Sequence, residues 1–123
     1  METVETDDAP AAVGAYSQGT ATDDLVFTAG QIPLKPDGEA VDGGVTEQTR
    51  RALENVGAVL GAGGSSLDDA VKVTVFLDDI GDFDEMNSVY ETFFDDAPPA
   101  RSAVEVAEVP KGFAVEIEAV GAR

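Results

Sequence analysis

The side chains best suited to chemistry in this 123-residue sequence are an arginine and two carboxylates near its C-terminal end. Arg101 follows Pro98 and Pro99, and consecutive prolines make the loop that enters it stiff and non-helical. From Arg101 onward the pattern is that of a strand, in which the guanidinium lies beside small residues that leave room for an anion. A planar guanidinium can hold a carboxylate through two parallel hydrogen bonds. The sequence therefore predicts a carboxylate-binding site at Arg101.

Glu116 and Glu118 are the candidate proton acceptors. They alternate with apolar residues in a strand expected over 113–120, so both lie on the face away from the apolar side chains. One of them could act as a base, or both could be solvated surface acids in so acidic a protein. A short turn is expected to pair this strand antiparallel with the Arg101 strand. If Glu116 lies on the same side as Arg101, the guanidinium that binds an anion lies next to a proton acceptor.

The charge balance is the outlier of the composition. Asp and Glu total 25 against 7 Lys and Arg, which gives a formal net charge of −18. Phosphate binding depends on clustered Lys and Arg, so nucleic acid is not an expected partner. Near 1 M salt the screening length falls to about 3 Å and most self-repulsion disappears. Because the acids are spread along the chain, we interpret them as a halophilic adaptation, the alternative being an acidic protein from an ordinary cytoplasm.

The sequence contains neither cysteine nor histidine. This removes disulfides, thiolate nucleophiles, the usual metal ligands and the usual general base, so no metal site is expected. Any chemistry must use carboxylates, tyrosine, arginine, hydroxyl groups or the backbone. Without a basic, then apolar N-terminal segment or a long apolar run, we expect a cytoplasmic protein with no membrane partner.

The hydrophobic periodicity places these residues in one domain over residues 9–123, preceded by a flexible acidic arm over residues 1–8. A strand over 25–32 should form a hairpin with the segment before it. Gly30 near its end indicates a close backbone approach, a bulge or simply the strand end. The remaining elements are expected at these ranges: an amphipathic helix over 45–60, a strand over 67–77, an aromatic-striped helix over 83–94 and the two C-terminal strands.

Asn87 is the polar exception on the aromatic stripe of the second helix. Such a stripe usually packs in a hydrophobic core. A buried asparagine needs hydrogen-bond partners, so Asn87 either bonds nearby backbone or faces an interface or a site.

Nearly the whole chain, from about Ala9 to Arg123, resembles the reactive-intermediate deaminase family (RidA, also called YjgF). The most specific segment is Pro99-Ala100-Arg101-Ser102-Ala103-Val104-Glu105-Val106, followed by Val115-Glu116-Ile117-Glu118. The other similar segments, in the family's order and spacing, are residues 14–18, 28–33, 53–56, 71–77 and 87–94.

The resemblance implies an α+β fold in which two helices pack on one face of a mixed sheet, a chorismate-mutase-like arrangement. It also implies a homotrimer whose sheets close a central β-barrel, with sites in clefts between subunits. The implied activity is cofactor-independent hydrolysis of enamine and imine acids, such as 2-aminoacrylate, 2-iminopropanoate and 2-iminobutanoate. These reactive intermediates, released by pyridoxal-phosphate enzymes, become 2-oxo acids and ammonia.

The family's site residues can be transferred position by position. Its carboxylate-binding arginine falls on Arg101 and its water-activating glutamate on Glu116. Its substrate-binding positions fall on Tyr16, the Gly30 backbone and Asn87. A sixth position, Ala103, stands where many members have cysteine, and Ala29 stands where serine is common. We expect both differences to change pocket shape or substrate choice, since arginine and glutamate supply the chemistry.

Two other functions are weighed against deaminase activity. The same clefts could serve a non-catalytic trimeric module that binds small metabolites or proteins. A ribonuclease or translation inhibitor, a name attached to some family members, is disfavoured by the charge of −18 and the absence of a basic patch.

Overall fold

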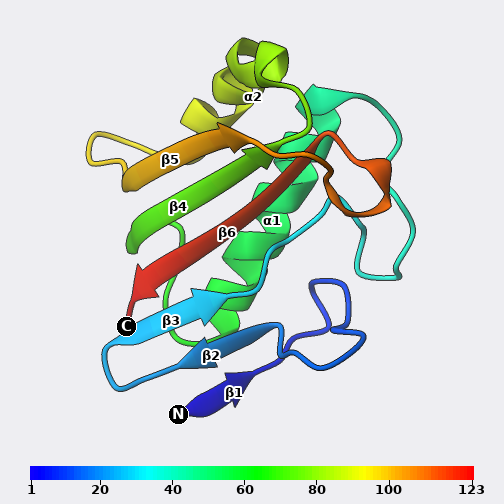
Figure 1. The fold of residues 1–123 in the computed structure, drawn as a ribbon. Helices are drawn as coiled ribbons and strands as arrows, with labels where there is room; N and C mark the ends of the chain where they lie inside the picture. Colours follow the sequence, from blue (N-terminus) through cyan, green and yellow to red (C-terminus); the bar gives the residue numbers. More distant parts are fainter.

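The protein forms a single mixed sheet with two helices on one face, as the sequence predicts (Figure 1). The computed structural model describes all residues 1–123. The strands lie in the order β1-β2-β3-β6-β4-β5. Their bounds are Glu2–Val4 (β1), Gly19–Ala21 (β2), Leu25–Thr28 (β3), Ala70–Leu77 (β4), Ala100–Glu105 (β5) and Val115–Ala122 (β6). The helices span Val45–Ala62 (α1) and Phe83–Tyr90 (α2).

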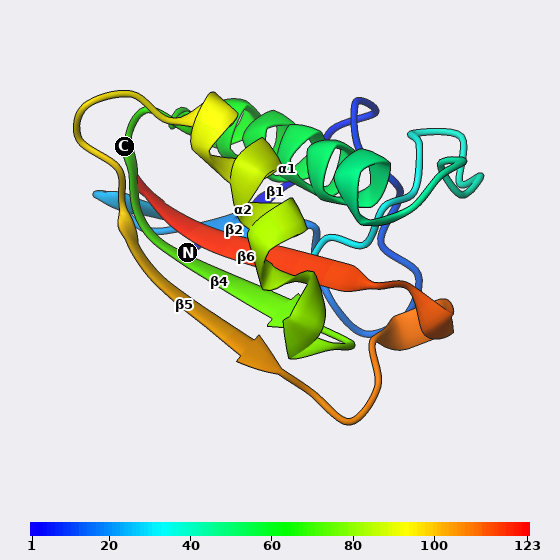
Figure 2. The same cartoon turned by 90° about the horizontal axis from the view of Figure 1, so that it is seen from above.

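Both helices pack on the same side of the sheet, as Figure 2 shows from above. The apolar stripe of α1, including the fully buried Leu53, Val56 and Leu60, faces the sheet. Inward side chains of β4 and β6, among them Val75 and Ile117, complete a core of 19 buried residues. The alternation that predicted a buried and an open face for the last strand is therefore confirmed.

The pairing of the C-terminal strands differs from expectation. The Arg101 strand, β5, pairs in parallel with β4 at the edge of the sheet, and β6 pairs antiparallel with β4 on its other side. The strands β5 and β6 are therefore separated by β4, and the expected hairpin between them is wrong. The physical reason is the connection through α2, because a helical crossover returns the chain in parallel beside β4.

The N-terminal segment is ordered where a flexible arm was expected. Residues 2–4 form β1, which pairs with β2, and Val4 is 5% exposed within the core. The side chain of Arg123 forms an ion pair with Glu2, which joins the two ends of the chain. Three residues are too few for a period to be visible in the sequence, so this pairing could not be predicted.

The sheet face away from the helices has no covering element within the chain (Figure 2). Phe27 of β3 is 39% exposed and Val104 of β5 is 43% exposed. Neither helix has the length and apolar character needed to span a membrane.

Candidate functional site

The guanidinium of Arg101 lies over aromatic residues of α2. Its guanidinium carbon lies 4.6 Å from the centre of the Tyr90 ring and 5.3 Å from that of Phe83. One terminal nitrogen, Nη1, donates a 2.6 Å hydrogen bond to Oδ1 of Asn87. Cation–π contact and the hydrogen bond together fix the orientation of the fork. Asn87, the polar exception on the helix stripe, thus faces a site and orients the cation.

The Arg101 side chain opens into a pocket of about 350 Å³. The pocket lies between α2 and the loop before β5, and its lining includes Asn87, Tyr90 and Pro99. No protein carboxylate forms an ion pair with Arg101. The guanidinium therefore keeps N–H donors for an external anion, in a pocket partly lined by aromatic carbon.

Glu116 lies in a second, larger pocket of about 650 Å³. Gly30 lies directly against its carboxyl group. A Cβ at Gly30 would lie 2.9 Å from both Cδ and Oε2 of Glu116, closer than real Cβ contacts allow. Of the three interpretations of Gly30 left open by the sequence, the structure shows the close backbone approach.

Burial raises the pKa of Glu116 above the usual value for a glutamate, and the neighbouring Glu118 carboxylate raises it further. Each effect disfavours the charged form, the first through lost solvation and the second through like-charge repulsion. A carboxylate with a raised pKa is a stronger proton acceptor once ionised. The environment of Glu116 thus suits a proton acceptor.

The remaining predicted site residues divide between these pockets. Tyr16 lines the Glu116 pocket together with Gly30 and Ala29, and its side chain is 54% exposed. The hydroxyl of Tyr16 accepts a long, 3.4 Å contact from the Val13 N–H in the loop that forms the pocket rim. Ala103 lies on the same face of β5 as Arg101 but packs against the core and lines neither pocket within one chain.

Within one chain, Arg101 and Glu116 lie on opposite faces of the sheet. Arg101 pairs across β4 with Val73 and Ala119, whose side chains face the helices. Glu116 pairs with Phe76 and points to the other face. A single chain therefore does not form the anion fork beside a proton acceptor that the hairpin would have produced. It carries two separate pockets, one at Arg101 and one at Glu116.

Two buried amides support the Glu116 pocket and were not singled out in the sequence. Gln18, 4% exposed, donates from Nε2 to the carbonyls of Thr6 and Pro10, at 3.0 and 2.8 Å, and so ties down the loop that carries Pro10 into the pocket. Asn55 of α1 is fully buried. Its place on the largely apolar buried face of α1, which also carries Thr49, is the signal that could have identified it.

No group of acidic side chains is arranged to hold a metal ion. The chemistry available to these residues is anion binding by Arg101 and proton transfer by Glu116.

Comparison with known proteins identifies relatives along the whole chain. A family model described as Endoribonuclease L-PSP matches residues 6–123. A RutC family protein of Pyrococcus abyssi is 48% identical over 97% of this chain and 94% of its own length. The 2-iminobutanoate/2-iminopropanoate deaminase of Salmonella typhimurium is 46% identical over 99% of this chain and 98% of its own. The crystal structure of Escherichia coli TdcF with bound serine, 44% identical, covers 100% of this chain and 99% of that chain with a TM-score of 0.95.

Proposed function

The chain belongs to the Endoribonuclease L-PSP family, which includes the RidA/YjgF proteins, and from this premise we propose that it is a 2-iminobutanoate/2-iminopropanoate deaminase. The substrates are short 2-imino acids and their enamine forms, and the products are 2-oxo acids and ammonia. The observation that carries the proposal is the Arg101 guanidinium, which is oriented by Asn87 and Tyr90 and has no protein carboxylate as a partner.

In the proposed mechanism Arg101 holds the carboxylate of the imino acid, which positions the C=N carbon. Glu116 accepts a proton from water as the water oxygen bonds to that carbon, and the C=N electron pair moves to the nitrogen, which takes a proton from solvent. In the resulting carbinolamine the Glu116 carboxyl gives its proton to the amino nitrogen, the C–N bond breaks to release ammonia, and the hydroxyl proton passes to solvent as the carbonyl forms. Orientation together with one proton acceptor is sufficient, since positioned acid–base groups typically contribute about 10² to 10⁴ in rate.

We infer that the complete site forms between subunits of a homotrimer. Because Arg101 and Glu116 lie on opposite faces of one chain, one substrate can reach both only if neighbouring copies place the two half-sites together. The open sheet face, with Phe27 and Val104 exposed, offers apolar surface for such an assembly. In this arrangement one subunit supplies Arg101 and Asn87, and its neighbour supplies Tyr16, Gly30 and Glu116.

The charge of the chain supports a small substrate rather than RNA, despite the description of the family model. A net charge of −18 repels a polyanion, whereas a single carboxylate needs only the local field of Arg101. RNA binding that survives molar salt would contradict this preference.

The direct test couples the purified protein to a threonine or serine dehydratase, which releases the imino acid, and follows its decay in high salt. We expect faster decay with the wild-type chain and the uncatalysed rate with Arg101→Ala. Carboxylate binding without faster ammonia release would instead identify a non-catalytic binding module. Arg101→Ala with full activity would exclude Arg101 as the carboxylate clamp.

A further inference from the structure

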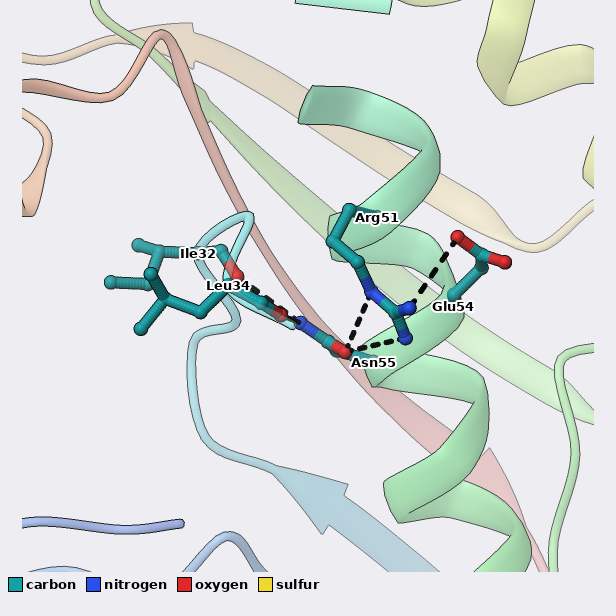
Figure 3. Close-up of polar contacts among 5 residues, drawn as sticks. All are labelled: Ile32, Leu34, Arg51, Glu54 and Asn55. Carbon is teal, nitrogen blue, oxygen red and sulfur yellow. Dashed lines mark hydrogen bonds and ion pairs between the residues drawn. The ribbon is translucent and has the colours of Figure 1, made fainter. Parts of the chain in front are cut away.

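Asn55 joins α1 to the chain segment that forms one wall of the Glu116 pocket. Its side-chain nitrogen Nδ2 donates to the carbonyls of Leu34 at 2.8 Å and Ile32 at 3.2 Å (Figure 3). Both Ile32 and Leu34 line the pocket, as does Gly30. An amide that is 0% exposed and bonded to two carbonyls more than 20 positions away fastens this wall to the helix.

Arg51, one turn earlier in α1, fixes the orientation of that amide. Its Nε and Nη2 donate to Oδ1 of Asn55 at 3.1 and 2.8 Å, and its Nη1 lies 3.9 Å from Glu54 (Figure 3). Two donors on the amide oxygen leave the amide nitrogen to face the two carbonyls. A rotated amide would place its NH₂ group against the guanidinium, which has only donors.

The same wall is fastened to β6 beside Glu116. The backbones of Gln31 and Ile117 exchange two hydrogen bonds, of 2.7 and 3.0 Å. This pairing places Gly30 over the Glu116 carboxyl, at the distance that leaves no room for a Cβ. The wall is thus held by the sheet at one end and by Asn55 at the other.

We propose that Arg51 and Asn55 are positioning residues for the reaction: they hold the segment from Gly30 to Leu34 against the Glu116 carboxyl. The inference rests on the proposed function for its catalytic meaning. Neither residue lines the Glu116 pocket. Both act through the backbone of this wall.

Loosening this wall should change the pKa of Glu116, which a general loss of stability would not do. The titratable groups around Glu116 are Glu118 on the same strand and Tyr16 and Lys111 in the pocket. On the neighbouring strand β4, the residue paired with Glu116 is the uncharged Phe76. Loosening the wall changes none of these charges but admits water to the Glu116 carboxyl. Because burial is the main cause of its raised pKa, that pKa should fall toward the ordinary glutamate value.

The experiment compares Arg51→Met and Asn55→Leu with Arg50→Met, which removes an exposed arginine from the neighbouring position of α1. Asn55→Leu is of similar size and adds no charge, but it has no donor for the two carbonyls. We expect a lower Glu116 pKa in carboxyl NMR titrations of both test variants and a kcat/KM lower by about tenfold to a hundredfold. The acid limb of the pH–rate profile should shift to lower pH, while Arg50→Met behaves as the wild type.

The NMR titration needs no substrate, so it tests the positioning role even if the wild type fails as a deaminase. An unchanged Glu116 titration in a folded Arg51→Met variant would overturn the inference, whatever happens to its melting temperature. Arg51→Met decides the matter alone if Asn55→Leu does not fold.

Discussion

The environment of Glu116 disfavours the ionised form of its side chain. Burial and the Glu118 carboxylate both disfavour its ionised form. Destabilised ionisable groups of this kind concentrate at functional sites. The folded-state pKa lies above the unfolded value, so the stability that this group contributes is fully present below the unfolded pKa and is lost as pH rises through the folded pKa.

Replacing Glu116 with glutamine should therefore separate activity from stability. We expect Glu116→Gln to lower kcat by about 10² to 10⁴ and to raise the melting temperature at neutral pH. The gain in melting temperature should shrink as pH falls below the ordinary glutamate pKa, where the wild-type carboxyl is also neutral. Thermal unfolding across this pH range, with the exposed Glu39→Gln as the matched control, checks the prediction; a Glu116→Gln variant that keeps full activity would exclude Glu116 as the base.

In the wild type, activity should rise with pH through the pKa of Glu116, because only the ionised carboxylate accepts a proton. The midpoint of this acid limb should lie above the usual glutamate range. Initial rates with a chemically generated imino acid, corrected for the uncatalysed reaction at each pH, measure it. A midpoint at or below the ordinary value would show that another group controls the limb.

Arg101→Lys keeps the positive charge but loses the planar fork that lies on Tyr90 and bonds to Asn87. We expect KM to rise by about tenfold or more, since hydrogen bonds to charged groups contribute about 1.5 to 3 kcal/mol. Steady-state kinetics of Arg101→Lys and Arg101→Ala, measured side by side, distinguish the contribution of the guanidinium geometry from that of the positive charge. Equal KM values for Arg101→Lys and the wild type would show that charge alone suffices.

At the scale of elements, the approach of the 29–33 segment to β6 leaves no room for a side chain at residue 30. Gly30→Ala should displace the Glu116 carboxyl and reduce activity, because its Cβ would meet Cδ and Oε2 at 2.9 Å. Gly61→Ala makes the same chemical change near the end of α1, where a Cβ meets nothing within 4 Å.

The Gly61→Ala control should stabilise the protein by roughly 0.5–1 kcal/mol and leave activity unchanged. Chemical denaturation and the coupled assay measure both properties. A fully active Gly30→Ala variant would show that the segment from Gly30 to Leu34 can move away without affecting the function of Glu116.

Local sequence patterns predicted the helices and strands, whereas the pairing of distant strands determines where the site residues lie. The alternation around Ile117 gave the two faces of β6, and the apolar stripe around Leu53 gave the buried face of α1. No local pattern shows that β4 lies between β5 and β6, so the sequence could not place Arg101 and Glu116 on opposite faces. The role of Asn55 was hidden for a related reason, because its partners Ile32 and Leu34 are distant in the sequence.

At the scale of the whole molecule, a net charge of −18 should make assembly depend on salt. At about 0.1 M salt the screening length is about 10 Å and like charges on neighbouring subunits repel; near 1 M it is about 3 Å. We expect loss of the proposed trimer, or a lower melting temperature, when salt is removed. Light scattering and circular dichroism check this, with sucrose as an uncharged control, and a trimer of equal stability in dilute buffer would contradict the halophilic interpretation.

Because Arg101 and Glu116 lie on opposite faces of one chain, the proposed catalytic site must be shared between neighbouring subunits, each of which supplies one half-site. A trimer of Arg101→Ala subunits has intact Glu116 half-sites, and a trimer of Glu116→Gln subunits has intact Arg101 half-sites. Each variant alone should be inactive. Random mixing brings an intact half-site from each parent together wherever the two kinds of subunit adjoin in the right order.

The measurement is the imino-acid hydrolysis of trimers made by co-refolding equal amounts of Arg101→Ala and Glu116→Gln, compared with each variant refolded alone. If neighbouring subunits share each site, random mixing should restore about a quarter of wild-type activity. If each chain works by itself, every chain in the mixture remains defective. Mixed trimers verified by mass spectrometry that stay as inactive as either parent would contradict the account.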